Sequence, residues 1–230
     1  MADQHAPVED VEHELTLPEE LVLLAYDDEK GHTWNSSLDT GLGGAVMLDL
    51  SLRGRVEVRD KDLAVVDPTP TGDPVLDAAL AEVAGARRPK PPKSWLGGLG
   101  RAARPASLDR LVERGVLARD ERKALGLFSY TRYPEADGGP EQRVRQRLHD
   151  AVVVGTTPDA RTAALASLVK ALGMRREVFP DADRRATDRR LAELAEGAWA
   201  SDAVKKAVDE MALVVMMVTT SAATTTAASS

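Results

Sequence analysis

Cysteine is absent from this 230-residue chain, and aromatic residues make up only 3% of it. The absence of cysteine excludes disulfides, thiolate zinc sites and cysteine nucleophiles, and it agrees with a reducing compartment. With so few aromatics, Leu, Val and Ala must fill the core, which favours packed helices over a β-sandwich. A hydrophobic fraction of 43% is sufficient for such a core. We therefore expect a mainly α fold, a compact helical bundle-like domain with one or two small β-hairpins.

Long apolar runs are also missing. The most apolar stretch, residues 211–218, is much shorter than the roughly 20 residues that a membrane-spanning helix needs. Residues 1–14 are polar and acidic, unlike a secretory signal. Residues 219–230 are a Thr/Ala/Ser tract with too little apolar bulk to offset the entropy of ordering. The sequence predicts a cytoplasmic protein with a flexible acidic N-terminus, one domain over residues 15–218 and a disordered tail.

Residue clusters typical of a catalytic or metal site are missing as well. No serine follows a strand at a sharp turn into a helix, and no carboxylate pair is singled out by its spacing. The glycines at 41, 43 and 44 lie inside a predicted helix, so we interpret them as sites of close helix packing and not as a phosphate loop. The histidines are scattered without a neighbouring carboxylate cluster; they are His5, His13, His32 and His149. We expect no catalysis, no cofactor and no metal.

The N-terminal part of the chain predicts helices and a hairpin. Thr16, followed by Pro18 and Glu19, is typical of a helix start, because threonine caps the first turn and proline is tolerated within it. A second apolar stretch ends before Gly54, a residue suited to a helix C-terminus. Two short apolar runs flank a polar turn, as in a β-hairpin. The predicted elements are helices at 15–26, 38–52 and 75–83, and a hairpin at 55–66.

The remaining part of the chain begins with a stretch rich in Pro and Gly. Residues 85–105 predict a long ordered loop or linker, after which Ser107 caps a short helix over residues 108–114. Residues 125–133 are the best strand candidate of this part and predict a second hairpin. Further helices are predicted at 141–154, 159–172, 186–199 and 201–218.

Positive charge is concentrated in one short segment. The net charge of the chain is −7, which opposes non-specific attraction to anionic surfaces. Residues 87–104 nevertheless contain no acidic residue. Each basic residue beside an anionic leaflet contributes about 1 kcal/mol, so this segment is sufficient for reversible docking. Its basic residues are Arg87, Arg88, Lys90, Lys93, Arg101 and Arg104.

Trp95 lies within this basic segment. An indole flanked by cations suits the headgroup zone of a membrane, and arginine can bind phosphate through two hydrogen bonds. This combination indicates a phosphate-bearing lipid headgroup. The alternative interpretation is a solvated basic loop whose Trp95 packs on the core.

Several blocks of the sequence, taken in order, resemble the Golgi phosphoprotein family. The resemblance covers residues 15–218 and implies a mostly helical fold with a β-hairpin used in oligomerisation. It also implies an adaptor role, since eukaryotic members bind phosphatidylinositol 4-phosphate and the cytosolic tails of glycosyltransferases. The Ala- and Arg-rich composition favours a bacterial member. The blocks are LTLPEELVLLAYDDEKG (15–31), the Trp-Asn and Gly-Leu pairs within 34–42, LSLRGRV (50–56), PTGDPVLDAAL (70–80) and LVERGVL (111–117).

The resemblance also implies particular site residues. The lipid pocket of the family combines a tryptophan, an arginine nine residues later, and two arginines three apart ahead of a helix resembling LVERGVL. In this chain Trp34, Arg101 and Arg104 match, whereas the remaining position is Gly43, so one phosphate ligand is missing. The implied lipid-binding residues are therefore Trp34, Arg101 and Arg104. The assisting residues would be Arg87, Arg88, Lys90, Lys93 and Trp95.

These patterns predict a peripheral adaptor on the inner face of a membrane. It would bind phosphatidylinositol or its phosphate and the cytosolic tails of membrane enzymes, and form a homo-oligomer through the 125–133 hairpin. One alternative is a winged-helix nucleic-acid binder, because residues 15–66 follow the order helix, helix, hairpin. Asp39 and Asp49 in the candidate recognition helix make it a poor surface for phosphates, so we expect no nucleic-acid partner. The other alternative is an oligomeric protein-interaction scaffold without lipid affinity.

Overall fold

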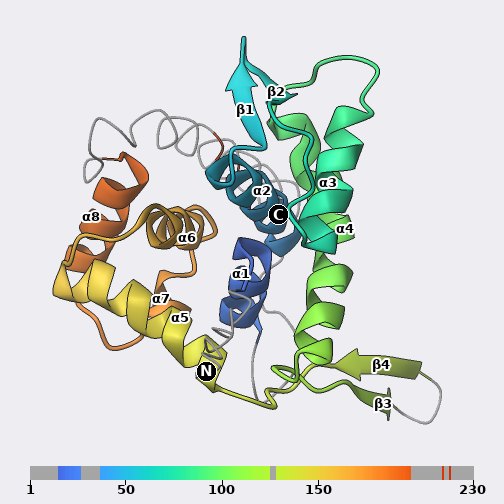
Figure 1. Ribbon diagram of the computed structural model, residues 1–230. Helices are drawn as coiled ribbons and strands as arrows, with labels where there is room; N and C mark the ends of the chain where they lie inside the picture. The colour runs from blue at the N-terminus through green and yellow to red at the C-terminus, as the bar shows by residue number, and fades with distance from the viewer. Residues whose placement is uncertain (1–14, 27–36, 125–127, 198–213, 215–217, 219–230) are drawn as a thin grey trace, which may run out of the picture.

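The computed structural model describes residues 15–26, 37–124 and 128–197, together with Val214 and Val218. These residues form a mainly helical structure with two small antiparallel hairpins, as predicted (Figure 1). The elements are α1 (Leu17–Ala25), α2 (Leu38–Leu52), β1 (Val56–Arg59), β2 (Asp62–Val65), α3 (Pro74–Ala84), α4 (Lys93–Glu113), β3 (Asp120–Ala124), β4 (Phe128–Arg132), α5 (Gly139–His149), the π-helix η1 (Asp150–Val154), α6 (Ala160–Ala171), α7 (Arg175–Val178) and α8 (Arg184–Ala195). The termini predicted to be flexible, and most of the helix predicted at 201–218, lie outside the described residues.

Helix α1 begins at the predicted cap. The Thr16 side chain accepts a hydrogen bond from the backbone N–H of Glu19, and the Glu19 carboxylate accepts one from the backbone N–H of Thr16 at 2.7 Å. This reciprocal pair satisfies two donors that the first turn would otherwise leave unpaired. All nine residues of α1 are buried, Glu19 and Glu20 among them. Helix α1 is therefore an internal element whose charged side chains need partners inside the protein.

Helix α2 lies at the centre of the molecule. It packs against α1, α3, α4 and α6, and Figure 1 shows these helices arranged around it. Its residues from Gly41 to Leu50 are all buried. A helix that is apolar on every side is an interior helix, since it has no face suited to water. This burial also removes α2 as a recognition helix for nucleic acid, because such a helix must be free to enter a groove.

Glycines allow α2 and α4 to touch through their backbones. A Cβ atom placed on Gly43 would lie 2.0 Å from the carbonyl oxygen of Leu96, and one on Gly100 would lie 1.6 Å from that of Asp39. No larger residue can occupy either position while the helices keep this separation. The prediction that the glycines of α2 serve close helix packing is confirmed.

The predicted loop at 85–105 is wrong over most of its length. Helix α4 begins at Lys93 and continues through Pro105 to Glu113, so Ser107 lies inside this helix and not at its start. Proline has no N–H for the carbonyl of Arg101, which would normally cost several kcal/mol. Burial of apolar side chains at helical spacing against α2 offsets this cost; they are Leu96, Leu99, Ala103, Leu108 and Leu111.

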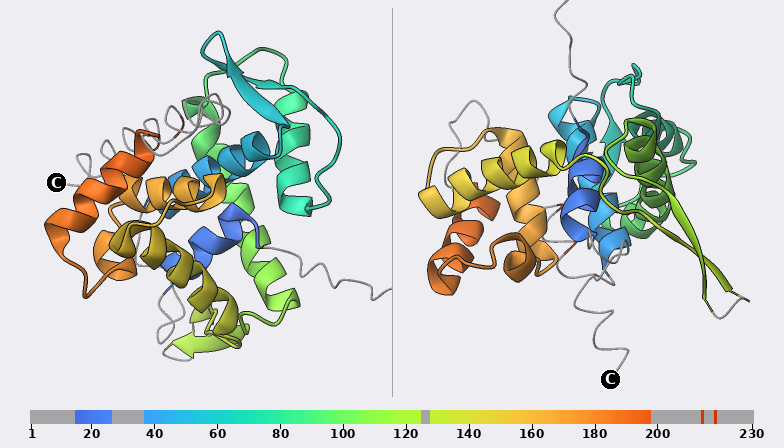
Figure 2. Two further views of the ribbon diagram at one scale, coloured as in Figure 1. Left: turned by 60° about the vertical axis from the view of Figure 1, so that its left-hand side comes forward. Right: turned by 90° about the horizontal axis from the view of Figure 1, so that it is seen from below.

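The two hairpins lie at opposite ends of the molecule. Strands β1 and β2 are joined by Asp60 and Lys61, which both have positive φ angles, 52° and 72°. Such a left-handed pair is the geometry of a two-residue hairpin turn. Strands β3 and β4 project away from the helices, most clearly in the right-hand view of Figure 2. Both hairpins were predicted, although residues 125–127 of the second lie outside the described residues.

The C-terminal part packs α5, α6, α7 and α8 beside α1 and α2 (Figures 1 and 2). The predicted helix 141–154 is confirmed, but its last turn widens into the π-helix η1 and ends at Gly155, whose φ is 88°. The Arg190 guanidinium on α8 donates to the carbonyls of Ala151 and Thr156, which stabilises this end. None of the helices in the described part of the chain is both long and apolar enough to cross a membrane.

Candidate functional site

Arg101 and Arg104 lie on one side of α4, separated by about 4.5 Å along its axis, because a helix rises 1.5 Å per residue. Arg101 is exposed and forms no ion pair with the described residues. Arg104 is half-buried, and its Nη1 lies 3.3 Å from Oδ1 of Asp39 in the first turn of α2. The structure therefore presents one exposed guanidinium, without an ion pair in the described part of the chain, beside one that is paired with Asp39.

The surroundings of Arg104 favour its charged form. Burial acts to lower the pKa of Arg104, but hydrogen bonding to Tyr26 and the negative charge of Asp39 outweigh that effect and raise the pKa above its ordinary value. The Tyr26 ring in turn stands edge-to-face with Tyr133, with 6.2 Å between centroids. Tyr133 lies under the guanidinium of Arg119 at 6.0 Å. This chain of contacts fixes the position of Arg104.

Trp34 belongs to the segment 27–36, which lies outside the described residues. Described residues on either side of it in the chain lie near Arg104. Tyr26 at the end of α1 acts to raise the pKa of Arg104, and Asp39 at the start of α2 forms an ion pair with it. Tyr26 and Asp39, which flank this segment in the chain, are thus brought together at Arg104.

Gly43, at the position where the resemblance would require an arginine, faces the backbone of α4. A Cβ atom there would meet the carbonyl oxygen, carbonyl carbon and Cα of Leu96 at 2.0 to 2.7 Å. The space needed for a side chain is occupied by the helix itself. The missing arginine is therefore a consequence of how closely α2 and α4 pack in this chain.

The predicted assisting residues divide between surface and core. Arg87, Arg88 and Lys90 are exposed in the segment between α3 and α4, and Lys93 is exposed at the start of α4. Trp95 is only 4% exposed. It lies six residues before Arg101, about 120° around the helix axis from it. The structure does not bring Trp95 and the arginine pair together on one face.

Trp95 has an internal role. Its Nε1 donates to the carbonyl of Lys90 at 3.3 Å, and the ammonium of Lys90 lies 4.7 Å above its ring. The indole therefore holds the Pro-rich segment against α4. This placement agrees with the alternative interpretation in which Trp95 packs on the core.

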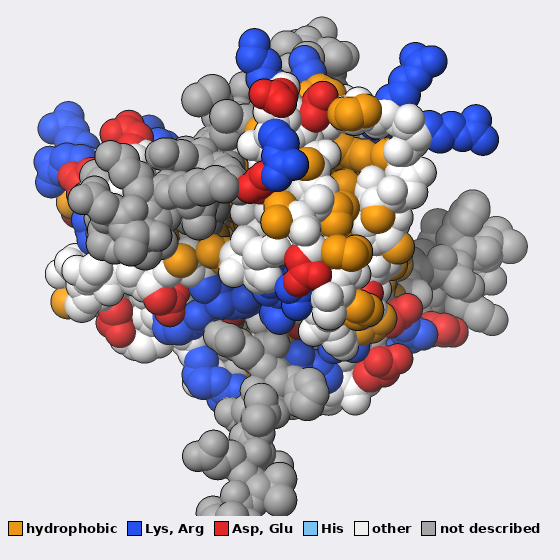
Figure 3. Space-filling model, turned by 45° about the horizontal axis from the view of Figure 1, so that its top comes forward, with side chains coloured by type: hydrophobic (Ala, Val, Ile, Leu, Met, Phe, Trp, Pro, Cys, Tyr) orange, Lys and Arg blue, Asp and Glu red, His pale blue; other side chains and the backbone are white. Residues whose placement is uncertain are grey.

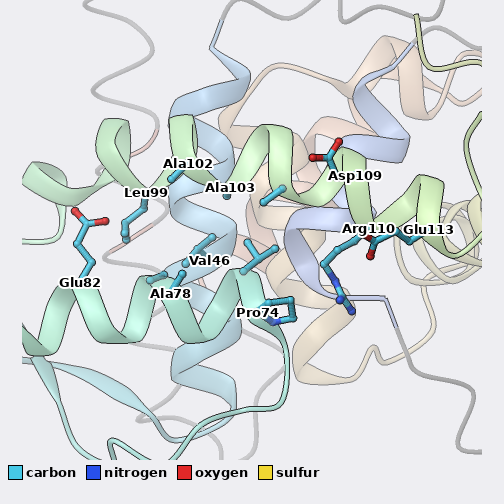
Figure 4. Close-up of a pocket in the computed structure, with 13 residues that line it drawn as sticks. Val46, Pro74, Ala78, Glu82, Leu99, Ala102, Ala103, Asp109, Arg110 and Glu113 are labelled. Atoms are coloured by element: carbon cyan, nitrogen blue, oxygen red, sulfur yellow. The ribbon is translucent and has the colours of Figure 1, made fainter. Parts of the chain in front are cut away.

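A groove with a volume of about 310 Å³ runs between α3 and α4. Figure 4 shows Glu82 at one end of it and Asp109, Arg110 and Glu113 at the other. Small side chains lie between them, namely Ala78, Ala79, Ala102, Ala103 and Ala106. Glu82 and Glu113 are exposed and have no ion pair with the described residues, so the two ends of the groove carry negative charge. The sequence contained no motif that predicted this groove.

Buried ion pairs hold α1 beneath these surfaces. Glu20 lies 2.5 Å from Arg147 of α5 and 3.3 Å from Arg161 of α6, and Arg161 also lies 3.4 Å from Asp49 of α2. Burial raises the pKa of Glu20, while Arg161 and Arg147 act in the opposite direction. On the other side of α1, Glu19 pairs at 3.3 Å with Arg110 of α4 and with Arg114, the residue that follows α4. These pairs tie α4, α5 and α6 to α1, and Arg161 links α6 to α2 as well. Sequence reasoning missed them because their partners are up to 141 residues apart.

No group of His, Asp or Glu suited to a metal ion occurs among the residues that the structure describes.

Two further residues of the arginine site, Tyr26 and Asp39, were also not predicted. Tyr26 ends a helix and Asp39 begins one, and no spacing in the sequence links either of them to Arg104. Only the packing of α4 across α1 and α2 brings them together.

Comparison with known proteins gives a family and a relative. The model of the family described as Golgi phosphoprotein 3 (GPP34) matches residues 17–211. The chain is also similar to vacuolar protein sorting-associated protein 74 of Eremothecium gossypii, with 29% identity over 165 residues. That alignment covers 60% of this chain and 49% of the relative, so the chain spans about half the length of this curated relative.

Proposed function

The chain belongs to the Golgi phosphoprotein 3 family, and on this premise we propose that it is a peripheral membrane adaptor that binds anionic, phosphoinositide-type headgroups. The binding residues are Arg101 and Arg104, together with Trp34. The observation that carries the proposal is the exposed guanidinium of Arg101 beside an Arg104 that Asp39 and Tyr26 hold in position. Two guanidinium groups on one face suit a phosphate, which each can bind through paired hydrogen bonds. No catalytic step is part of this function.

The absence of an arginine at position 43 sets the expected headgroup. A hydrogen bond to a charged group is worth about 1.5–3 kcal/mol, and Gly43 cannot supply one. Binding is therefore weaker than a three-arginine site would give, or it shifts towards phosphatidylinositol, which carries fewer charges. The exposed Arg87, Arg88 and Lys93 add non-specific attraction to an anionic surface.

Co-flotation with liposomes tests the lipid proposal. The wild type should bind vesicles containing phosphatidylinositol or its 4-phosphate, bind neutral vesicles little, and release as salt is raised. Loss of two basic residues removes about 2 kcal/mol of membrane-binding free energy, so Arg101→Ala/Arg104→Ala should bind roughly 30-fold more weakly. The matched control is Arg185→Ala/Arg189→Ala, which removes the same charge from exposed positions of α8. Equal binding by both double variants, or no binding to any anionic vesicle, would refute the proposal.

The adaptor role also requires a surface for a protein partner. We propose that the groove between α3 and α4 receives the cytosolic tail of a membrane enzyme. Its alanine floor suits an apolar stretch, and Glu82 and Glu113 at its ends suit flanking basic residues. Fluorescence anisotropy with synthetic tails of this type should show binding that Ala102→Trp abolishes. Ala84→Trp, which adds an indole to an exposed position outside the groove, should leave tail binding unchanged.

We further propose that the hairpin over residues 125–133 mediates self-association. The β3–β4 hairpin projects from the body, and its two strands pair only with each other among the described residues. Strands with unpaired edges can add a neighbouring chain. Sedimentation velocity should show an oligomer for the wild type and a monomer when residues 122–130 are replaced by a short Gly-Ser linker. If that monomer still floats with anionic vesicles, association and lipid binding are separate functions; an unchanged oligomer would refute the hairpin contact.

A further inference from the structure

A second pocket, with a volume of about 320 Å³, lies beneath the β1–β2 hairpin, on a different side of α4 from the arginine pair. Buried Leu63, Val83 and Trp95 contribute its apolar floor. Ala64, Ala86 and Pro89 add apolar walls. The volume lies at the lower end of the range for small-molecule pockets, which suits a short apolar group.

The pocket is built by specific contacts between its walls. The backbone N–H of Leu63 in β2 donates to the carbonyl of Lys90 at 2.9 Å, and the same carbonyl accepts the indole N–H of Trp95 at 3.3 Å. These two bonds fasten the segment between α3 and α4 to the hairpin on one side and to α4 on the other. The opening beside them is therefore part of the folded structure.

Cations and carboxylates lie on different parts of the mouth of this pocket. Arg88 is exposed and has no ion pair with the described residues, and the ammonium of Lys90 lies over the Trp95 ring. Arg59 also lines the pocket, but it pairs with Glu57 at 2.5 Å. The carboxylates of the rim, Asp60 and Asp62, belong to the hairpin. An anionic group would therefore bind on the wall formed by Arg88 and Lys90. Figure 3 shows Lys and Arg side chains extending from the upper edge of the molecule, with Asp and Glu side chains among them, above a run of hydrophobic side chains.

From this arrangement we infer that the pocket beneath the β1–β2 hairpin binds a single-chain anionic amphiphile, with its alkyl chain on Leu63, Val83 and Trp95 and its acidic head at Arg88 and Lys90. The apolar floor excludes a bare anion as the preferred ligand, because a bare anion would leave this surface uncovered. The cations discriminate against a neutral chain of the same length. Neither Arg101 nor Arg104 lines this pocket, so the inference does not depend on the proposed headgroup site.

Isothermal titration calorimetry with octyl phosphate, below its micellar concentration, tests the inference. The wild type should bind octyl phosphate at least tenfold more tightly than inorganic phosphate or octyl glucoside. Ala86→Phe fills the pocket without changing charge and should lower affinity at least tenfold. Unchanged affinity in Ala86→Phe would overturn the inference, as would equal affinity for inorganic phosphate or for the glucoside.

Charge variants distinguish binding in this pocket from general attraction to the surrounding positive charge. Arg88→Glu/Lys90→Glu should lower affinity for octyl phosphate at least tenfold, while the two hydrogen bonds to the carbonyl of residue 90 remain because neither uses the side chain of that residue. Arg87→Glu/Lys93→Glu makes the same charge change at exposed positions that do not line the pocket, and should retain most of the affinity. An equal loss of affinity in both double variants would indicate general electrostatic attraction and would overturn the inference.

The arginine pair provides the remaining control. Arg101→Ala/Arg104→Ala should bind octyl phosphate like the wild type, and Ala86→Phe should float with phosphatidylinositol vesicles like the wild type. If the headgroup proposal is wrong, the arginine variant should still bind octyl phosphate. If the pocket proposal is wrong, Ala86→Phe should still float with the vesicles. Loss of octyl phosphate binding in the arginine variant would place the ligand at the headgroup site and overturn the inference. Thermal unfolding monitored by circular dichroism should confirm that every variant is folded.

Discussion

Gly43 and Leu96 are in direct backbone contact, with 2.0 Å between the position that a Cβ would take on Gly43 and the carbonyl oxygen of Leu96. This single contact explains two features of the chain. It lets α2 and α4 pack without intervening side chains, and it leaves no room for the arginine that the family resemblance would put at this position.

Gly43→Ala should therefore destabilise the fold. Forcing a methyl group into a filled core costs about 1–3 kcal/mol, and here the obstacle is backbone that cannot move alone. The control is Gly98→Ala on the exposed side of α4, where the nearest atom to the new Cβ is 3.9 Å away. Alanine is a better helix former than glycine, so that variant should gain roughly 0.5–1 kcal/mol. Urea unfolding measures both, and a neutral Gly43→Ala would contradict the packing argument.

Asp39 should limit the attraction of anionic lipid to Arg104. Its carboxylate lies 3.3 Å from the guanidinium and offsets part of its charge. Asp39→Ala should therefore bind anionic vesicles up to about fivefold more tightly at low salt, consistent with roughly 1 kcal/mol for a partly exposed pair. Asp181→Ala removes an equal charge from an exposed position elsewhere and should change binding little. Weaker binding of Asp39→Ala would contradict this expectation and would show that the position of Arg104 matters more than its net charge.

Arg161 should be among the residues most important for stability. Its side chain is 13% exposed and pairs with the buried carboxylates of Glu20 and Asp49. Arg161→Ala leaves both without this partner, which typically costs about 3–5 kcal/mol. Arg184→Ala breaks a surface pair with Asp188 in which Arg184 is 79% exposed, and should cost about 0.5 kcal/mol or less. Chemical denaturation distinguishes the two, and similar costs would show that the buried pairs do not hold α1.

Asp77 should contribute a small pH-dependent stability. Burial acts to raise the pKa of its carboxyl, but hydrogen bonds from Thr71 and the backbone N–H of Gly72 outweigh it, so the pKa is lowered below its ordinary value. The unfolded chain has an ordinary pKa of about 3.9. The contribution is therefore present above that value and is lost as the pH falls through the lower pKa of the folded state.

Comparison of the wild type with Asp77→Asn tests this expectation. The difference between their free energies of unfolding should be constant between about pH 5 and 7 and should shrink below about pH 4. A difference that grows on acidification would contradict the lowered pKa. Because Asp77 is largely solvated, the effect should be smaller than that of Arg161→Ala.

Local patterns in the sequence determined much of the secondary structure. Thr16, Pro18 and Glu19 specify the start of α1 because capping uses only neighbouring residues. The bounds of α2 and the position of the β1–β2 hairpin follow from apolar periodicity and turn residues for the same reason. The basic segment that contains Arg101 and Arg104 was also evident, since charge composition is a local property.

Tertiary structure alone decided what the Pro- and Gly-rich segment becomes. Its composition predicted a loop, yet contact with α2 makes Lys93–Glu113 one helix, because buried Leu side chains and close glycine packing outweigh the cost of Pro105. That helix places Trp95 in the core and Arg104 against Tyr26 and Asp39. The pocket beneath the hairpin and the ion pairs of α1 likewise join residues that are distant in the chain. Such contacts depend on how the helices pack, and packing is set by the whole core and not by any local stretch of sequence.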